Sequence, residues 1–357
     1  MDHFDQDTYH NLPVEIWKHI IDSDIDSTLN LLFSCKQFIG LVCVLTNSLN
    51  LLNLLVKRGN LKFLEFYFRF NIETNKSYTE QRLKIEQNEC LKMSCIHGRL
   101  EILKHLISKG VNFRIDDDEP LMLAVENGRL EIVQFLHGKR VNIRARNNRP
   151  LILSCEKGHI NIVKFLLEKK VTFVSKQNEV FCTACKFGQM DIVKLLVEKG
   201  ADINGGKIPP IRSAAEGGHL NVIEYLVSKG ASIDKYSIDA LFSAAFYGHL
   251  DVVKYLLGYI SEVNFIYYAF EKACLNGHIN IVQYLFSENI ITGDIIAENN
   301  NTRYLFYHTI RNKHKHIIKF LIENNIFDKD KKYPDILESA PKDMDPYDYL
   351  ISFLNYQ

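Results

Sequence analysis

A glycine recurs along this chain at an almost constant spacing of thirty residues. It stands at positions 98, 128, 158, 188, 218, 248 and 277, so only the last step, of 29, departs from 30. Such regularity over seven copies excludes chance and predicts a repeat array, in which each repeat packs mainly on its neighbours. The length of 357 residues, which would otherwise suggest about two globular domains, is compatible with one extended array.

Each repeat predicts two helices joined at the glycine. A short apolar segment such as Pro120–Val125 precedes Gly128, and glycine adopts the positive φ that ends a helix without steric cost. Apolar residues then recur 2, 4, 5 and 8 positions after the glycine, which is the spacing of one helical face. In the repeat of Gly128 these residues are Leu130, Ile132, Val133 and Leu136. A loop of alternating character follows, as in Val141-Asn142-Ile143.

Two stretches carry a family resemblance. Residues 199–204 read Lys-Gly-Ala-Asp-Ile-Asn and residues 248–256 read Gly-His-Leu-Asp-Val-Val-Lys-Tyr-Leu. They resemble the "G-A-D-x-N" and "G-H-L-x-V-V-x-x-L" stretches of ankyrin repeats. Prolines 120, 150 and 210 stand eight residues before their glycines, as the ankyrin proline does. The resemblance implies an all-α solenoid of helix-turn-helix repeats that binds a protein target on its concave surface.

These repeats are shorter than the 33 residues of the ankyrin family. Both helices keep their register, so the three missing residues lie in the finger between the Ala-Asp strand and the proline. We therefore predict shortened fingers or simple loops. Degenerate copies around Gly59 and Lys313 bring the array to about nine repeats over residues 46–327, with inserted loops near 71–88 and 291–301. A tail of residues 328–357 follows, with a short helix at Tyr347–Asn355.

Residues 1–45 do not follow the repeat and predict two helices. Pro13 suits the first turn of a helix and Glu15 its positive end, while Leu12, Ile16 and Ile20 share one face. A second helix is expected after Asp26. This segment resembles an F-box, and an F-box followed by ankyrin repeats resembles proteins of large DNA viruses. The alternative is a helical cap for the N-terminal end of the array.

The F-box resemblance implies a Skp-type adaptor as a partner and, through it, a cullin-RING ubiquitin ligase. The implied adaptor contacts are Leu12, Pro13, Glu15, Ile16, Ile20, Leu29, Lys36 and Phe38. We refer to residues 1–45 below as the F-box-like segment.

The sequence carries no motif for catalysis, phosphate binding or a metal site. Cys182-x-x-Cys185 lacks a second pair, and cysteine stands three residues before the glycine in several repeats, where it serves as a small core residue. Histidines 159, 219, 249 and 278 follow the repeat glycine and would lie about 8–10 Å apart in a stack, too far to share an ion. We therefore expect no catalytic residue, no cofactor and no metal, and interpret these histidines as structural.

Charge and composition limit the partners and the compartment. The chain has 43 basic and 43 acidic residues, which excludes a uniformly basic nucleic-acid binder. The acidic N-terminus lacks the pattern of a signal peptide, and the uncharged stretch Gln37–Val56 is too polar for a membrane span. We expect a monomer that binds neither nucleic acid nor membrane, located in the cytoplasm or nucleus of the host cell and not secreted.

The loops and exposed aromatic residues supply candidate contacts to a protein target. An acidic loop containing Asp117 precedes a basic loop containing Arg144 and Arg146. The two loops form a polar recognition edge or simply attract each other. Tyr236 and Tyr247 are candidate aromatic anchors, as are Tyr267 and Tyr268, although packing explains them equally well.

These inferences predict a non-enzymatic protein that brings a bound target to a ubiquitin ligase. The alternative is a plain ankyrin scaffold that binds a single host or viral protein without any link to ubiquitin.

Overall fold

The computed structural model describes residues 48–74, 78–115, 118–173, 178–298, 305, 308–309 and 311–324. Every regular element among these residues is a helix, which confirms the predicted all-α fold. The chain divides into two compact units, residues 1–141 and 142–357, which we describe separately. The F-box-like segment, the tail and both predicted boundaries of the solenoid lie outside the described residues, so they stay predictions.

Helices alternate between the first and the second helix of each repeat. The first compact unit contains α4 (Ser48–Arg58), α5 (Leu61–Thr74), α6 (Glu80–His97), α7 (Leu100–Ser108), α8 (Glu119–Glu126) and α9 (Leu130–Gly138). The second contains α10 (Ala145–Glu156), α11 (Ile160–Glu168), α12 (Glu179–Lys186), α13 (Met190–Glu198), α14 (Pro210–Gly217), α15 (Leu220–Ser228), α16 (Ile233–Tyr247), α17 (Leu250–Leu257), α18 (Val263–Leu275), α19 (Ile279–Ser287), α20 (Gly293–Glu298) and α22 (Lys315–Glu323).

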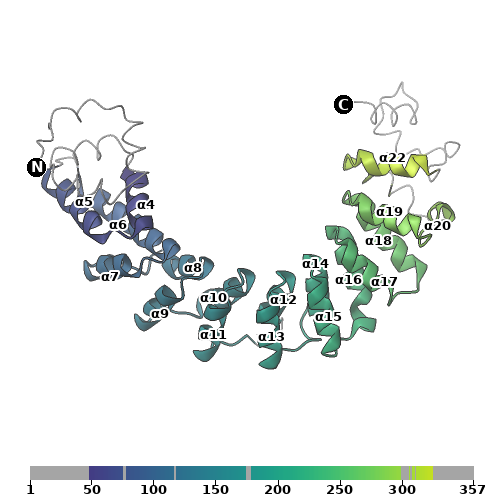
Figure 1. Cartoon of the computed structure of the whole chain (residues 1–357), viewed down its shortest axis with the longest axis horizontal. Helices are drawn as coiled ribbons and strands as arrows, with labels where there is room; N and C mark the ends of the chain where they lie inside the picture. Colours follow the sequence, from purple (N-terminus) through teal and green to yellow (C-terminus); the bar gives the residue numbers. More distant parts are fainter. Residues whose placement is uncertain are drawn as a thin grey trace, which may run out of the picture. The chain divides into compact units, whose positions relative to one another are not determined.

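The second compact unit is a stack of two helical layers. The first helices α12, α14, α16 and α18 lie side by side in one layer, and the second helices α13, α15, α17 and α19 lie in the other (Figure 1). Neighbouring first helices pack on each other more extensively than neighbouring second helices do. Among the described residues, no helix is both long enough and apolar enough to cross a bilayer.

The repeat glycines end the first helices as predicted. All seven have φ between 66° and 87°, in the left-handed region that favours glycine. The degenerate repeats at both ends of the array have the same turn. Gly59 has φ 79° and α5 begins two residues later, while Lys313 has φ 64° and α22 begins two residues later. Both copies therefore have the turn of the repeat, and the number of repeats in the array stays a prediction.

The core consists of the apolar positions predicted from the period, with one difference. Ile132, Val133 and Leu136 of α9 are almost completely buried, and the equivalent residues of the other second helices follow them. Leu130, two residues after the glycine, is only half-buried because it is the first residue of its helix. The cysteines three residues before the glycine are fully buried, which confirms their interpretation as core residues: Cys95, Cys155, Cys185 and Cys274.

The shortened fingers are turns or helical extensions, and the described residues contain no strand. Before Pro150, three consecutive residues have positive φ, Arg146 at 50°, Asn147 at 56° and Asn148 at 64°. In the repeat of Gly248, α16 begins already at Ile233 and includes residues that the alternating pattern predicts as a loop. Burial of Ile233, Ser237 and Ala240 on one face of α16 explains this extension.

The prediction of inserted loops near residues 71–88 and 291–301 is wrong. Helices α5 and α6 are 14 and 18 residues long and occupy most of the first insertion, and α20 occupies residues 293–298 of the second, whose last three residues lie outside the described ranges. The Thr79 side chain caps α6 by accepting a hydrogen bond from the Arg82 amide at 3.2 Å. The buried Glu86 carboxylate accepts bonds from Tyr67 Oη at 3.2 Å, Tyr78 Oη at 2.6 Å and Arg82 Nε at 3.1 Å. This buried network stabilises the helical form.

Candidate functional site

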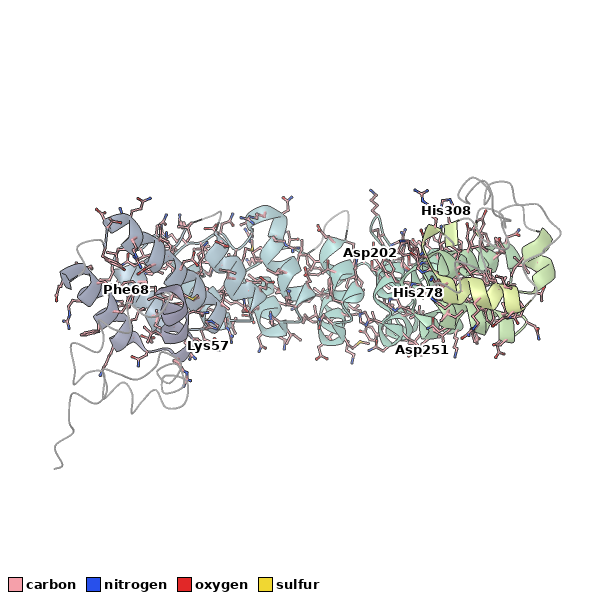
Figure 2. All side chains as sticks on the ribbon, turned by 90° about the horizontal axis from the view of Figure 1, so that it is seen from above. Lys57, Phe68, Asp202, Asp251, His278 and His308 are labelled. Atoms are coloured by element: carbon pink, nitrogen blue, oxygen red, sulfur yellow. The ribbon has the colours of Figure 1, made fainter. Side chains whose placement is uncertain are left out.

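Hydrogen bonds to the backbone of the preceding repeat use the residue that follows the repeat glycine. In the first compact unit, Arg99 Nε donates to the Lys57 carbonyl at the end of α4 at 3.0 Å, and Arg129 Nε donates to the Ile96 carbonyl at 2.8 Å. In the second, Nε2 of His249 donates to the Glu216 carbonyl at 3.0 Å, and Nε2 of His278 to the Phe246 carbonyl at 2.8 Å. Figure 2 labels two of these residues, Lys57 and His278. These histidines are therefore structural, as predicted.

The first helices, in contrast, carry a position whose chemistry differs from repeat to repeat. It stands six residues before the glycine and holds Lys92, Met122, Ile152, Cys182, Arg212, Phe242 and Glu271. Ile152 and Glu271 are buried, and the other five are half-buried. The core positions keep their character from repeat to repeat, and this position does not. One repeat therefore differs from the next on the exposed face of its first helix.

Four aromatic side chains gather on this face in the second compact unit. Phe242 of α16 lies 6.0 Å from Tyr268 and 6.4 Å from Phe265 of α18, measured between ring centroids. Phe246 stands one turn after Phe242 on α16 and is 44% exposed, and Tyr268 is 42% exposed. We call these four residues the aromatic patch. Exposed aromatic side chains at this density are typical of protein-binding surfaces.

A half-buried arginine lies beside the aromatic patch. Arg212 of α14 donates from Nε to Ser243 Oγ of α16 at 3.3 Å. The carboxylate one turn away, Glu216, pairs instead with Lys186 of α12 at 2.5 Å. Within the described part of the chain, no carboxylate lies within 4.0 Å of the Arg212 guanidinium. The remaining N–H groups of Arg212 are therefore available to an acceptor on a partner.

The basic loop residues predicted as target contacts lie in different surroundings. Arg144 Nη2 donates to the Lys170 carbonyl at 2.8 Å and to the Lys169 carbonyl at 3.4 Å, so it covers the C-terminal end of α11. Arg146 is exposed in the turn before Pro150. Asp117 lies outside the described residues. The role of these three residues in target binding therefore stays a prediction.

The predicted tyrosines divide between surface and core. Tyr236 is half-buried, and its Oη donates to the Asn204 carbonyl at 3.2 Å. Tyr247 is 48% exposed and packs edge-on against Phe246 with centroids 4.9 Å apart. Tyr267 is buried in the core, whereas its neighbour Tyr268 belongs to the aromatic patch. The predicted adaptor contacts Leu12, Pro13, Glu15, Ile16, Ile20, Leu29, Lys36 and Phe38 all lie outside the described residues.

Sequence analysis missed Arg212, Phe242, Phe246 and Phe265 as site residues. A signal for Arg212 and Phe242 existed, because both stand six residues before a repeat glycine, where an alignment of the repeats shows changing chemistry. Phe265 had no such signal, since α18 begins earlier than the repeat predicts.

The described residues offer no evident reactive centre. No three of their histidine, cysteine, aspartate or glutamate side chains lie close enough to share a metal ion. Burial raises the pKa of Cys95 to about 12 and that of Cys182 to about 11, so both thiols stay protonated near neutral pH. Neither of these two thiols is therefore a nucleophile activated by a lowered pKa.

Several known proteins are similar to this chain. The family model for ankyrin repeats in three copies matches residues 41–147, 121–207 and 181–267. Putative ankyrin repeat protein L42 of Acanthamoeba polyphaga mimivirus is 91% identical over 357 residues, which is the whole of both chains. Putative ankyrin repeat protein R791 of the same virus is 34% identical over 104 residues, covering 29% of this chain and 35% of its own. The crystal structure of the human ASB11 ankyrin repeat domain is similar at a TM-score of 0.42 and 22% identity, covering 48% of this chain and 84% of its own.

Proposed function

Because the chain belongs to the ankyrin repeat family, a family of protein–protein interaction modules, and also carries the F-box-like segment, we propose that it is the target-binding subunit of a ubiquitin ligase. The first helices bind a protein target on their exposed face. The F-box-like segment binds a Skp-type adaptor and through it a cullin-RING ligase. The chain has no catalytic role of its own, and it works as a monomer in the cytoplasm or nucleus of the infected host cell, without contacts to nucleic acid or membrane.

One observation carries the target-binding half of this proposal. The core positions stay apolar or small in every repeat, whereas the position six residues before the glycine changes from lysine to methionine, arginine, phenylalanine and others. A repeat protein with constant internal packing and a variable exposed face is suited to recognising one particular partner. The aromatic patch and Arg212 give that face the residue types that dominate the binding energy of protein interfaces.

The sequence resemblance supports the adaptor-binding half. Leu12, Pro13, Glu15 and Ile16 match the start of the F-box pattern, and Leu29, Lys36 and Phe38 match its second helix. The mechanism is then one of proximity. A target on the first helices and a ligase on the F-box-like segment share one chain, which raises the effective concentration of each near the other. Ubiquitin transfer itself is the work of the ligase.

Capture of a purified Skp-type adaptor by the full-length chain tests the adaptor-binding half. We expect the wild-type chain to retain the adaptor and the double variant Leu12→Asp, Ile16→Asp to lose it, because two charges would enter the apolar adaptor contact. Lys18→Asp, on the same predicted helix but outside the implied contact, is the matched control and should retain the adaptor.

The alternative function, a plain ankyrin scaffold for one host or viral protein, predicts a different outcome. The wild-type chain would then capture no adaptor, or the double variant would capture as much as the wild type. Either result would refute the ligase link and leave target binding untouched. Deletion of residues 1–45 separates the halves further, since target binding should survive it and adaptor capture should not.

A further inference from the structure

We propose that Arg212 and the aromatic patch together bind a segment of the target in which an aspartate or glutamate stands beside bulky apolar side chains. This inference rests on the proposed function, because it assigns the chemistry of the partner to the same surface. Helices α14, α16 and α18, which carry these residues, lie next to one another in the first-helix layer (Figure 1).

The aromatic patch supplies the apolar half of the site. Its rings are arranged edge-on or tilted, with 67° between the planes of Phe242 and Tyr268 and 55° between those of Phe242 and Phe265. Rings set at such angles leave parts of their faces uncovered, and 42–44% of Tyr268 and Phe246 remains exposed. Bulky apolar side chains of a partner would cover this surface and remove it from water, which favours binding.

The guanidinium of Arg212 supplies the polar half. Its single bond to Ser243 Oγ fixes Nε and leaves the terminal N–H groups to an external acceptor. Arginine presents these groups as a planar fork that matches the two oxygens of a carboxylate. A bound partner would exclude water from this half-buried group, and a carboxylate would then replace the lost hydration, whereas an uncharged or basic segment would leave the cation unpaired.

The pairing of Glu216 leaves the positive charge of Arg212 to a partner. Glu216 stands one turn from Arg212 on α14, but its carboxylate pairs with Lys186 of α12. Because no carboxylate among the described residues lies within 4.0 Å of the Arg212 guanidinium, this group complements a carboxylate of the partner beside the aromatic rings.

Selection of random twelve-residue peptides displayed on phage against the immobilised full-length chain tests this proposal. We expect the enriched peptides to contain aspartate or glutamate next to phenylalanine, tyrosine, leucine or methionine. Arg212→Ala and Tyr268→Ala should each weaken the binding of a selected fluorescent peptide at least tenfold. The matched controls are Lys194→Ala, an exposed cation on α13, and Tyr259→Ala, which is 42% exposed like Tyr268 but follows α17. Both should change the dissociation constant less than twofold.

Exchange of the peptide carboxylate for its amide identifies the partner of Arg212. It should weaken binding to the wild-type chain at least tenfold and have little further effect on Arg212→Ala, because the pair is already lost. The proposal is overturned if no peptide is enriched, if the enriched peptides lack a carboxylate, or if the control variants weaken binding as much as Arg212→Ala and Tyr268→Ala. Far-UV circular dichroism verifies that each variant is folded. Adaptor capture by Arg212→Ala should equal that of the wild type, so failure here is distinguishable from failure of the ligase link.

Discussion

Alanine substitutions at two glycines of one repeat, Gly188 before α13 and Gly200 after it, separate backbone strain from side-chain crowding. Gly188 has φ 66° and Gly200 has φ 84°, so an alanine at either position is strained in the left-handed region. Their surroundings differ. A Cβ at Gly200 would meet no heavy atom within 4 Å, whereas a Cβ at Gly188 would lie 2.5 Å from Cε1 and 2.6 Å from Cγ of His219. Gly188→Ala must therefore also displace the His219 ring.

The expected costs follow from these two situations. Backbone strain alone should lower the free energy of unfolding by about 1–2 kcal/mol in Gly200→Ala. In Gly188→Ala the same strain is joined by crowding against the His219 ring, which adds about 1–3 kcal/mol. The total for Gly188→Ala is about 2–5 kcal/mol, above that of Gly200→Ala.

Urea unfolding of the full-length chain at pH 7.5, followed by far-UV circular dichroism, measures both variants. A third comparison isolates the ring: in a His219→Ala background, Gly188→Ala should cost only the strain, about 1–2 kcal/mol, because the displaced group is gone. Equal effects of Gly188→Ala and Gly200→Ala in the wild-type background would refute the reasoning. So would a cost of Gly188→Ala that is the same with and without His219.

Three further predictions concern backbone strain, protonation and thiol reactivity. Lys170 has φ 58° where other repeats hold glycine, so Lys170→Gly should raise the urea midpoint by the equivalent of about 0.5–1 kcal/mol, and a lower midpoint would contradict this. Burial lowers the pKa of His219 in the folded chain below the ordinary 6.5, so the unfolded chain binds this proton more strongly. The free energy of unfolding therefore falls as the pH drops from 6.5 through the pKa of the folded chain. His219→Gln should lose less stability than the wild type between pH 7.5 and 5.5, and equal losses would count against this cause. The third prediction uses a Cys35→Ser, Cys43→Ser background, which leaves six thiols. At most one of them should react with a disulfide reagent at pH 8 in the folded chain, because burial raises their pKa values, and all six should react after urea is added. Rapid reaction of several thiols in the folded chain would contradict their burial.

The period of the sequence predicts the fold because its signals are local. A glycine and four apolar residues within nine positions define one turn and one helical face, and these features recur in nearly every repeat. The lengths of α6 and α16 depend on non-local packing. Tyr67 and Glu86 are 19 residues apart in sequence, and no window of one repeat contains the buried hydrogen bond that joins them. The inserted segment was therefore predicted as a loop.

The binding surface was less predictable than the fold for a related reason. Arg212 and Phe242 are ordinary residues for an exposed or a buried helical position, and the sequence alone does not tell which they occupy. Their significance depends on the 3.3 Å bond of Arg212 to α16, on the pairing of Glu216 with another residue and on the proximity of α18. Each of these is a relation between repeats, which a pattern within one repeat does not contain.

The residue that follows the repeat glycine donates its hydrogen bond to a main-chain carbonyl of the preceding repeat. Arginine, glutamine and histidine serve as donors in different repeats, as in Arg129, Gln189 and His249, and the acceptor is a group that every amino acid possesses. Apart from the repeat glycine, whose missing Cβ leaves room for the donor side chain, a junction of this kind requires no particular side chain in the preceding repeat. Recombination in multiples of thirty codons would thus preserve these hydrogen bonds. Such a gene can gain, lose or reorder repeats while each new pair of neighbouring repeats keeps the same contact.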